Sequence, residues 1–360
     1  MTSGKKTNFI VSFVSILLIV GVMLILMLPL DKNLDNTTNE EKTLNSLKKV
    51  DNHPLFLMNF YGDYGLEQYL HRGLKNVKTG MNIHKISKEH TTIISPQSNW
   101  ACTCFTSLNS SADVKLYGRN FDWTTSPKLL LHTSPTSGYS SLTMVDLGML
   151  GFSTEAMVIN ASPDKIKDLL QTPYWTLDGM NDQGLAVACM AVPYAENFID
   201  STKVTLGSLA YMRFVLDFAK NIEEALTLWE QYNVDFTDGP PLHYLISDLG
   251  GNSAVIEFVG GEMKIIRNQF PWQVSTNFIL FNSTLSIQNA CWRFTTATEI
   301  LNNSKGNLTP EEAMQLLEDV SQLSTQWSVI YNLNTNDILL VIGRKYSQVL
   351  SYNILNNLSV

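Results

Sequence analysis

Short β-prone runs separated by turn residues fill much of the chain after residue 101. The runs CTCFTSL (102–108) and VKLYGRNFDW (114–123) flank NSSAD, a cluster of turn-forming residues, and together predict an antiparallel hairpin. If the turn centres near Ser111, residue 102 lies opposite residue 120, which brings two cysteines beside the segment from Arg119 to Asp122. Further strands are predicted in SLTMVDLG, GLAVACMAV, LHYLISD, SAVIEFVG and GGEMKIIR, and a last hairpin in WSVIYNLNTNDILLVIG.

Two consecutive helices are predicted in the middle of the chain, where apolar residues recur at helical spacing. The first covers GSLAYMRFVLDFAK (207–220), and the second, NIEEALTLWEQY (221–232), begins with Asn221 as its N-cap. A later helix begins after Thr309, with Pro310 at its first position. Strands, a central helical pair and further strands favour layered α+β architecture over a doubly wound parallel sheet.

An uncharged apolar run at residues 9–30 is long enough to span a bilayer as a helix. Lys5 and Lys6 precede it, so the positive-inside rule predicts a cytoplasmic segment at 1–8 and puts the rest of the chain across the membrane. No A-x-A cleavage motif closes the run, which favours a signal anchor over a cleaved signal peptide. We therefore expect a single-pass membrane protein whose main domain is extracytoplasmic, at the cell surface or in a secretory lumen.

The stretch between this run and residue 102 divides into two parts. Residues 31–50 are polar and charged, which predicts a juxtamembrane stalk. From His53 the chain becomes aromatic and apolar, in HPLFLMNFYGDYGLEQYLHRGLKN. This composition predicts that the stretch packs against another part of the protein. We interpret residues 31–101 as a stalk and prosegment with one docking portion, and residues 102–360 as the main domain.

The composition is that of a globular, acidic protein. The chain is 44% hydrophobic and 16% charged, with a formal net charge of −8 and a pI near 5.3. Phosphate binding needs clustered Lys and Arg, and the sequence shows no such cluster, so a nucleic-acid partner is not expected. The four cysteines are too few for a disulfide scaffold and lack C-x2-C spacing, so neither a disulfide framework nor a zinc site is expected.

A cysteine nucleophile needs a neighbour that stabilises its thiolate or takes its proton. None of the six histidines has a protease-like context; His243, in the strand-like LHYLISD, is a weak candidate, with a structural role as the alternative. A different base appears if the chain is cut just before the cysteine, because a free α-amino group has a pKa of about 7.7 to 8.0. Such an N-terminal nucleophile requires a prosegment, an Asp to hold the amine and an Arg to favour the thiolate, and all three accompany Cys102.

Several sequence blocks together resemble one known family. They are CTCF…LYGRNFDW, DGMNDQGLAVACMAVP, LHYLISDLGGNSAVIEFVGGEMKII, VSTNF and CWRF, in that order. The chain from Ala101 to its C-terminus is similar in them to the choloylglycine hydrolase family of linear amide C–N hydrolases. That family includes bile salt hydrolases and penicillin V acylases and, more distantly, acid ceramidase and N-acylethanolamine acid amidase. The resemblance implies an N-terminal nucleophile hydrolase fold, a four-layer αββα sandwich.

The resemblance also implies roles for individual residues. Cys102 would become the N-terminal nucleophile after cleavage of the bond before it. Arg119 and Asp122, in GRNFD, would tune the thiol and orient the amine, unless the two simply pair with each other. Asn277, in STNF, matches the family's asparagine near the oxyanion, and Arg293, in CWRF, matches its second active-site arginine.

The chain departs from the family pattern near the substrate. Ala191, in CMAVP, stands where bile salt hydrolases have an asparagine, so a backbone N–H would have to replace that oxyanion donor. This substitution weakens the case for a bile salt as substrate. Asn181, in DGMNDQG, is expected to shape a turn beside the site, and direct contact with substrate is the alternative.

The spacing around the cysteines leaves the nucleophile open. Arg119 follows Cys102 by seventeen positions and Cys104 by fifteen, against sixteen in the family. Thr103 favours Cys102, because a small hydroxyl residue follows the family's nucleophile, and Cys104 is the alternative. Strict strand alternation would send Arg119 and Asp122 to opposite faces, so we expect either that the strand ends at Asn120 or that a bulge re-aims it.

We therefore expect a self-cleaving cysteine hydrolase that cuts a linear amide of an N-acyl small molecule through a thioester. Its acyl group is expected to be apolar, and neither a metal nor an organic cofactor is expected. The alternatives are an acyltransferase of the same fold with an amine acceptor and a non-catalytic, membrane-tethered binding protein. After cleavage, the docking portion of residues 31–101 would either stay bound or release the enzyme.

Overall fold

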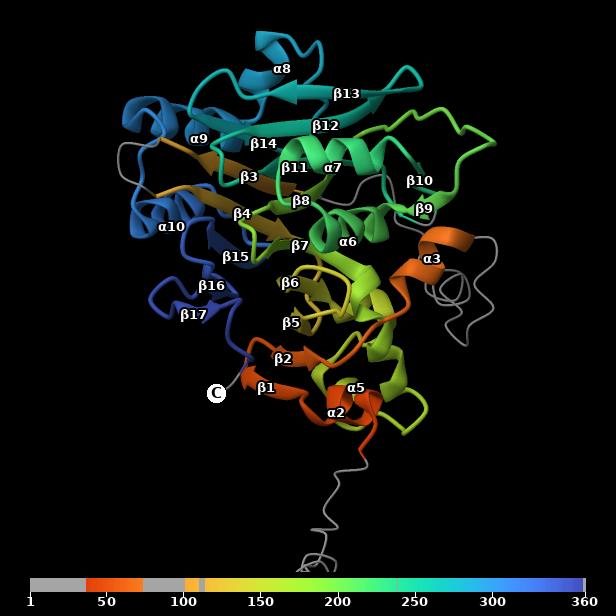
Figure 1. Cartoon of the computed structure of the whole chain (residues 1–360). Coiled ribbons are helices and arrows are strands. Elements are labelled where there is room, and N and C mark those ends of the chain that lie inside the picture. The colour runs from red at the N-terminus through yellow and green to blue at the C-terminus, as the bar shows by residue number, and fades with distance from the viewer. Residues whose placement is uncertain (1–36, 74–100, 110–113, 238, 359–360) are drawn as a thin grey trace, which may run out of the picture. The chain divides into compact units, whose positions relative to one another are not determined.

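Two β-sheets face each other in the part of the chain from Asn39 to the C-terminus (Figure 1). The computed structural model describes residues 37–73, 101–109, 114–237 and 239–358, so the apolar run at 9–30 lies outside the described residues. Among the described residues, no helix is both long and apolar enough to cross a membrane.

The first sheet has nine strands in the order β1-β2-β5-β6-β7-β8-β11-β12-β13. Its neighbours are antiparallel except for the parallel pair β2 and β5. The strands are β1 (Lys48–Asp51), β2 (Leu55–Phe60), β5 (Lys128–Thr133), β6 (Ser141–Asp146), β7 (Thr176–Asn181), β8 (Ala186–Ala191), β11 (Leu242–Ser247), β12 (Ser253–Val259) and β13 (Glu262–Arg267).

The second sheet has six strands in the order β14-β3-β4-β15-β16-β17, all antiparallel. A short parallel pair, β9 (Thr205–Gly207) and β10 (Asn233–Asp235), stands apart from both sheets. The six strands are β14 (Trp272–Ser275), β3 (Ala101–Ser107), β4 (Leu116–Asp122), β15 (Thr325–Asn332), β16 (Asp337–Ile342) and β17 (Leu350–Asn353).

Helices lie on the outer faces of the two sheets (Figure 1). Asn181 of β7 donates to the carbonyl of Leu216 in α6, whereas Asp178 of the same strand accepts from Trp327 of β15 on the other face. Asn120 of β4 likewise donates to Leu317 in α10. The helices are α2 (Asn39–Asn45), α3 (Leu66–Arg72), α5 (Glu155–Ile159), α6 (Ser208–Phe218), α7 (Ile222–Trp229), α8 (Leu285–Ala290), α9 (Trp292–Ser304) and α10 (Pro310–Asp319), with 3-10 helices η3 (Leu147–Leu150) and η4 (Ile166–Trp175).

The predicted mixed helix and sheet architecture is confirmed, and so are several local signals. Asn221 caps α7 by accepting from the N–H of Glu224, 2.9 Å away. Thr309 and Glu312 form a reciprocal capping box at the start of α10, with Pro310 at its first turn. Each such cap satisfies backbone donors that a helix end would otherwise leave without partners.

Residues 39–73, which we call the N-terminal segment, are part of the first sheet. The polar stretch predicted to be a stalk forms α2 and β1 from Asn39 to Asp51, and the apolar stretch after His53 forms β2 and α3. All six residues of β2 are buried, because β2 is an inner strand between β1 and β5. The polar composition did not predict a strand here, because β1 is a partly exposed edge strand and its lysines are equally typical of a linker.

Candidate active site

The hairpin of β3 and β4 brings the motif residues together. Cys102 lies opposite Phe121, and Cys104 lies opposite Arg119, so the predicted hairpin is confirmed with its register moved by one residue. Gly118 is required in this motif, because an added Cβ would lie 2.3 Å from the Phe105 ring on the neighbouring strand. The hairpin therefore packs a ring on its outer face while it presents both thiols on its inner face.

Arg119 extends between the two sheets to the Cys102 thiol. Its Nη2 lies 3.7 Å from Cys102 Sγ, and both side chains are buried. Burial raises the pKa of the Cys102 thiol, and the positive charge of Arg119 acts in the opposite direction. Arg119 is thus placed for the thiol-tuning role that the sequence suggested.

Asp178, which the sequence analysis did not single out, holds Arg119 in place. Its Oδ2 lies 2.9 Å from Arg119 Nη1 in a fully buried ion pair. Tyr331 and Trp327 also donate to this carboxylate, at 2.5 and 3.0 Å. Burial alone would lower the pKa of Arg119, but Asp178 and the neighbouring thiols raise it well above its usual value, so the guanidinium stays charged. Asp178 is the first residue of the block DGMNDQG, but nothing in that block marks it as the partner of Arg119.

Asn277 and Arg293 come to Cys102 from the other end of the chain. Asn277 Oδ1 accepts from the Cys102 N–H, 2.5 Å away, and Asn277 Nδ2 donates to the Ala191 carbonyl at 2.8 Å. Arg293 Nη1 donates to the Cys102 carbonyl and to Thr103 Oγ1, and its Nη2 lies 3.2 Å from Asn277 Oδ1. The structure therefore gathers all of these predicted positions around one residue.

Asp122 lies on the opposite face of β4 from Arg119. Its Oδ1 accepts from Thr325 Oγ1 at 2.5 Å and its Oδ2 from Gln322 Nε2 at 2.9 Å. The β3–β4 register is continuous, and the irregularity lies on β15, between Thr325 and Trp327. The expected end of the strand at Asn120, or a bulge there, is therefore wrong, because β4 continues regularly to Asp122. Arg119 pairs with Asp178 and not with Asp122. The Cys102 N–H donates to Asn277 Oδ1, and the hydrogen bonds of the Asp122 carboxylate come from Thr325 and Gln322.

The other cysteines near the site are enclosed. Cys104 and Cys189 are buried on the strands that line the space between the sheets. Burial raises the pKa of the Cys104 thiol far above its usual value, and that of Cys189 to about 12, despite the charge of Arg119. Arg119 Nη2 lies 3.7 Å from the Cys102 sulfur, which favours Cys102 as the reactive thiol.

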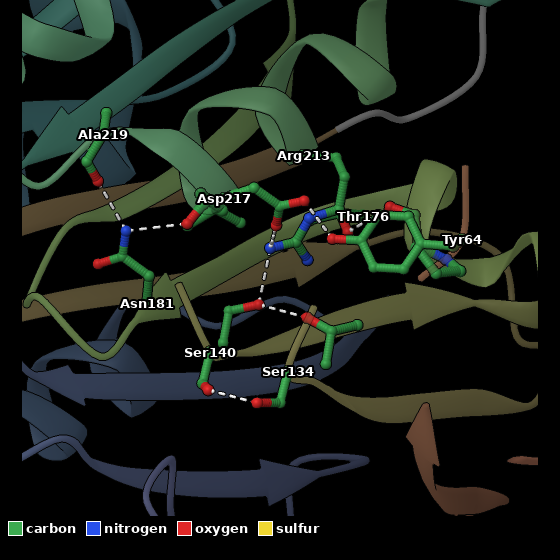
Figure 2. Close-up of polar contacts among 12 residues, drawn as sticks. Tyr64, Ser134, Ser140, Thr176, Asn181, Arg213, Asp217 and Ala219 are labelled. Carbon is green, nitrogen blue, oxygen red and sulfur yellow. Dashed lines mark hydrogen bonds and ion pairs between the residues drawn. The ribbon is translucent and has the colours of Figure 1, made fainter. Parts of the chain in front are cut away.

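Asn181 shapes the turn between β7 and β8. Its Oδ1 accepts from the N–H groups of Gln183 and Leu185, and its Nδ2 donates to the carbonyls of Leu216 and Ala219 (Figure 2). The side chain is fully buried on the α6 side of the sheet, away from the face that carries Asp178. Its hydrogen-bonding groups are all engaged, so the structure gives it the turn-shaping role and leaves no atom for direct contact with substrate.

Comparison with known proteins decides the family. A family model described as linear amide C–N hydrolases, choloylglycine hydrolase family, matches residues 102–305. The chain belongs to this family. The match begins at Cys102, the residue around which the site is built.

Relatives of this linear amide hydrolase support the assignment. Penicillin V acylase of Pectobacterium atrosepticum is 27% identical over 266 residues, which cover 64% of this chain and 69% of that protein. An uncharacterised protein of a Paramecium bursaria Chlorella virus is 33% identical over 113 residues, or 28% of this chain and 39% of that protein. The crystal structure of a mutant conjugated bile acid hydrolase from Clostridium perfringens superposes with a TM-score of 0.52 at 15% identity, covering 70% of this chain and 92% of that one, which shows a shared fold.

The enzyme class follows from family membership: the chain is an amidase or acylase of linear amides. The chemistry that the residues permit is nucleophilic, because a thiol, a guanidinium and an amide side chain lie together at Cys102. In the part of the chain that the structure describes, no three His, Cys, Asp or Glu side chains come together as a metal site requires.

Proposed function

We propose that this linear amide hydrolase is an N-terminal nucleophile hydrolase of the αββα type that cuts its own chain before Cys102 and then hydrolyses an N-acyl amide through a thioester. The observation that carries the proposal is the position of Cys102. Its thiol faces Arg119, and its backbone nitrogen, the atom that would become the α-amine, faces Asn277.

Self-cleavage would use the peptide bond that precedes the nucleophile. The Cys102 sulfur attacks the carbonyl carbon of Ala101, the C–N bond breaks, and the nitrogen takes a proton and becomes the free α-amine. The resulting thioester is hydrolysed by water, which leaves a carboxylate on Ala101 and the thiol on Cys102. Arg119 supports this sequence, because its charge opposes the effect of burial on the pKa of the thiol.

Turnover of substrate would repeat the same chemistry with a foreign amide. The α-amine, whose ordinary pKa of about 7.7 to 8.0 leaves part of it neutral near pH 7, takes the thiol proton and passes it to the leaving amine. Water then hydrolyses the thioester and regenerates the thiol. An oxyanion role for Asn277 is supported by its side-chain amide, whose Oδ1 accepts from the Cys102 N–H and whose Nδ2 is a donor directed at the Ala191 carbonyl in the uncleaved chain.

The deciding experiment is intact mass and N-terminal sequencing of the full chain after purification. We expect a new N-terminus at Cys102, a Cys102→Ala chain that stays uncleaved, and a Cys104→Ala chain that is cut as in the wild type. A mature N-terminus at Cys104 would move the nucleophile. Amidase activity in a chain that begins upstream of residue 102 would contradict the mechanism.

The substrate class is proposed to be an amide with an apolar acyl group. The names of the relatives supply two probes, penicillin V and a conjugated bile acid. Ala191 lacks the side-chain donor that bile salt hydrolases carry, so we expect the first probe to be cut faster. Release of free acid in the presence of added amine supports hydrolysis, whereas a new amide would indicate an acyltransferase.

We further propose that the N-terminal segment stays bound after cleavage. β2 is paired with β5 over six residues, and burial of each large apolar side chain contributes roughly 1.5–3 kcal/mol. Asn59 exchanges two hydrogen bonds with the backbone of Leu358, at 3.0 and 2.9 Å. The buried apolar side chains of β2 are Leu55, Phe56, Leu57, Met58 and Phe60.

A buried polar contact at the end of this segment supports its retention. Tyr64 donates to Asp217 of α6, which also pairs with Arg213 at 2.5 Å (Figure 2). Release of the segment would remove the Tyr64 hydroxyl from Asp217 Oδ2, and loss of the partner of a buried polar atom costs about 1–3 kcal/mol. Co-elution of the two fragments in gel filtration, and their separation only in denaturant, is the expected result.

Retention of the N-terminal segment would also decide where the cleaved enzyme is found. If residues 9–30 anchor the chain, a bound N-terminal segment would keep the cleaved enzyme at the membrane, on its extracytoplasmic side. Membrane fractionation after cleavage tests this, because release of the catalytic fragment by carbonate washing would contradict it.

A further inference from the structure

A histidine and a glutamate pair between strands β11 and β12, outside the set that contacts Cys102. His243 Nδ1 and Glu257 Oε1 lie 2.9 Å apart, and both side chains are fully buried. Removing either partner of such a buried pair is strongly destabilising, whereas the intact pair contributes little net stability. Its presence therefore calls for a role other than general stability.

Glu257 fixes the far end of the loop that carries Asn277. Its Oε1 accepts from the N–H of Leu280 at 2.7 Å, and its Oε2 accepts from the N–H of Phe281 at 2.8 Å. Hydrogen bonds to a charged carboxylate are roughly twice as strong as those between neutral groups. This end of the loop is therefore tied to β12 through both carboxylate oxygens.

His243 fixes the near end of the same loop. Its Nε2 lies 2.7 Å from the carbonyl oxygen of Thr276, the residue before Asn277. The other ring nitrogen, Nδ1, meets Glu257, so the two side chains are joined to each other and to both ends of the loop. The two side chains thus act as one clamp, and loss of either partner loosens both ends of the loop.

We propose that His243 and Glu257 are positioning residues that set Asn277 against Cys102 and Ala191. The inference rests on the function proposed above. Asn277 meets the Cys102 N–H at 2.5 Å and the Ala191 carbonyl at 2.8 Å, and residues 277–279, between the two clamped ends, belong to no helix or strand. A displacement of about 1 Å at a reacting group can lower a rate on the order of 100-fold.

A graded pair of substitutions tests the clamp. Glu257→Gln keeps the size and one oxygen acceptor, whereas Glu257→Ala removes both acceptors. We expect self-cleavage at Cys102 to slow by about 10-fold in Glu257→Gln and on the order of 100-fold in Glu257→Ala. Hydrogen exchange followed by mass spectrometry should show faster exchange in residues 276–284 in both variants, with the rest of the second sheet unchanged.

A second buried histidine supplies the matched control. His132 Nε2 lies 3.1 Å from the Ile354 carbonyl, remote in sequence from the Asn277 loop. His132→Gln should therefore leave the cleavage rate and the exchange of residues 276–284 as in the wild type, whatever its melting temperature. His243→Gln should slow cleavage and loosen the loop.

The outcomes separate this inference from the function on which it rests. Wild-type cleavage rates in both Glu257 variants would overturn the clamp, and so would unchanged exchange at 276–284. Partial rescue by Gln over Ala cannot come from general destabilisation if the two variants melt at the same temperature. A wild-type chain that never cleaves would overturn the proposed function, and the exchange result would then decide the clamp by itself.

Discussion

The two faces of strand β4 place their charged groups in different surroundings. On the face toward the first sheet, Arg119 forms a buried ion pair with Asp178, 2.9 Å apart. On the other face, Asp122 accepts from neutral donors, the hydroxyl of Thr325 and the amide of Gln322. The Asp178 carboxylate is therefore neutralised by the Arg119 guanidinium, whereas the Asp122 carboxylate has only uncharged hydrogen-bond donors.

This difference assigns the two carboxylates separate tasks. Asp178 holds the Arg119 guanidinium that approaches the Cys102 thiol. Asp178 therefore affects the thiol only while Arg119 is present. Burial raises the pKa of the Asp122 carboxyl, and the hydrogen bonds from Thr325 and Gln322 only partly offset that effect. Loss of the Arg119–Asp178 pair should therefore have the larger effect on the free energy of unfolding. Loss of the Asp122 carboxylate should mainly change how the pKa of Cys102 and the stability depend on charge and pH.

The largest effect is expected from Arg119→Met. The substitution leaves Asp178 buried without its cation, and breaking one partner of a buried pair typically costs about 3–5 kcal/mol. The free energy of unfolding, measured by urea denaturation, should fall by that amount. Self-cleavage should stop as well, because the thiol loses the charge that opposes burial.

The double variant Arg119→Met/Asp178→Asn is the control for this prediction. It removes both charges, so much of the lost stability should return, while self-cleavage should not. Equal losses in the single and double variants would show that the ion pair does not determine stability here. Recovery of cleavage in the double variant would show that Arg119 is not needed by the thiol.

The sequence predicted many of the strands and helices that follow residue 101. Strands β3, β4, β6, β8, β11, β12 and β13, helices α6, α7 and α10, and the hairpin of β15 and β16 all follow from periodicity and capping residues such as Asn221. The first two strands were not predicted, because the parallel pairing of β2 with β5 joins segments about seventy positions apart. No local pattern encodes a pairing over that distance.

The sequence predicted which residues gather at Cys102, but it did not predict which residue pairs with Arg119. Cys102, Arg119, Asn277 and Arg293 converge as the motif blocks suggested. The expected end or bulge of the strand at Asn120 was wrong, and Asp122 lies on the opposite face of β4 from Arg119. Asp178 was missed because a lone acidic residue before a turn has no motif of its own. Its partnership with Arg119 arises from the packing of one sheet on the other, which a single sequence does not reveal.

A smaller effect is expected from Asp122→Asn on thiol reactivity. The negative charge of Asp122 raises the pKa of Cys102, after burial and in opposition to Arg119. Its removal should lower that pKa, and a change of one pKa unit gives about tenfold more thiolate at a fixed pH below the midpoint. The pH profile of iodoacetamide labelling at Cys102, read by peptide mass in chains of equal processing state, measures this. Asp248→Asn, at the β11–β12 turn, is the control and should leave the profile unmoved.

The smallest effect is a pH dependence of stability that comes from the same carboxyl. Because the folded pKa of Asp122 lies above its unfolded value near 3.8, the folded state holds this proton more tightly. Asp122 therefore favours folding at acid pH, and this contribution is lost as pH rises from about 3.8 through the raised folded value. The stability of the wild type minus that of Asp122→Asn should fall over this window, as measured by urea denaturation at several pH values. Subtraction removes the other titrating groups that both chains share. A difference that stays constant with pH would mean that the Thr325 and Gln322 hydrogen bonds fully compensate burial, and the two faces of β4 would then be electrostatically alike.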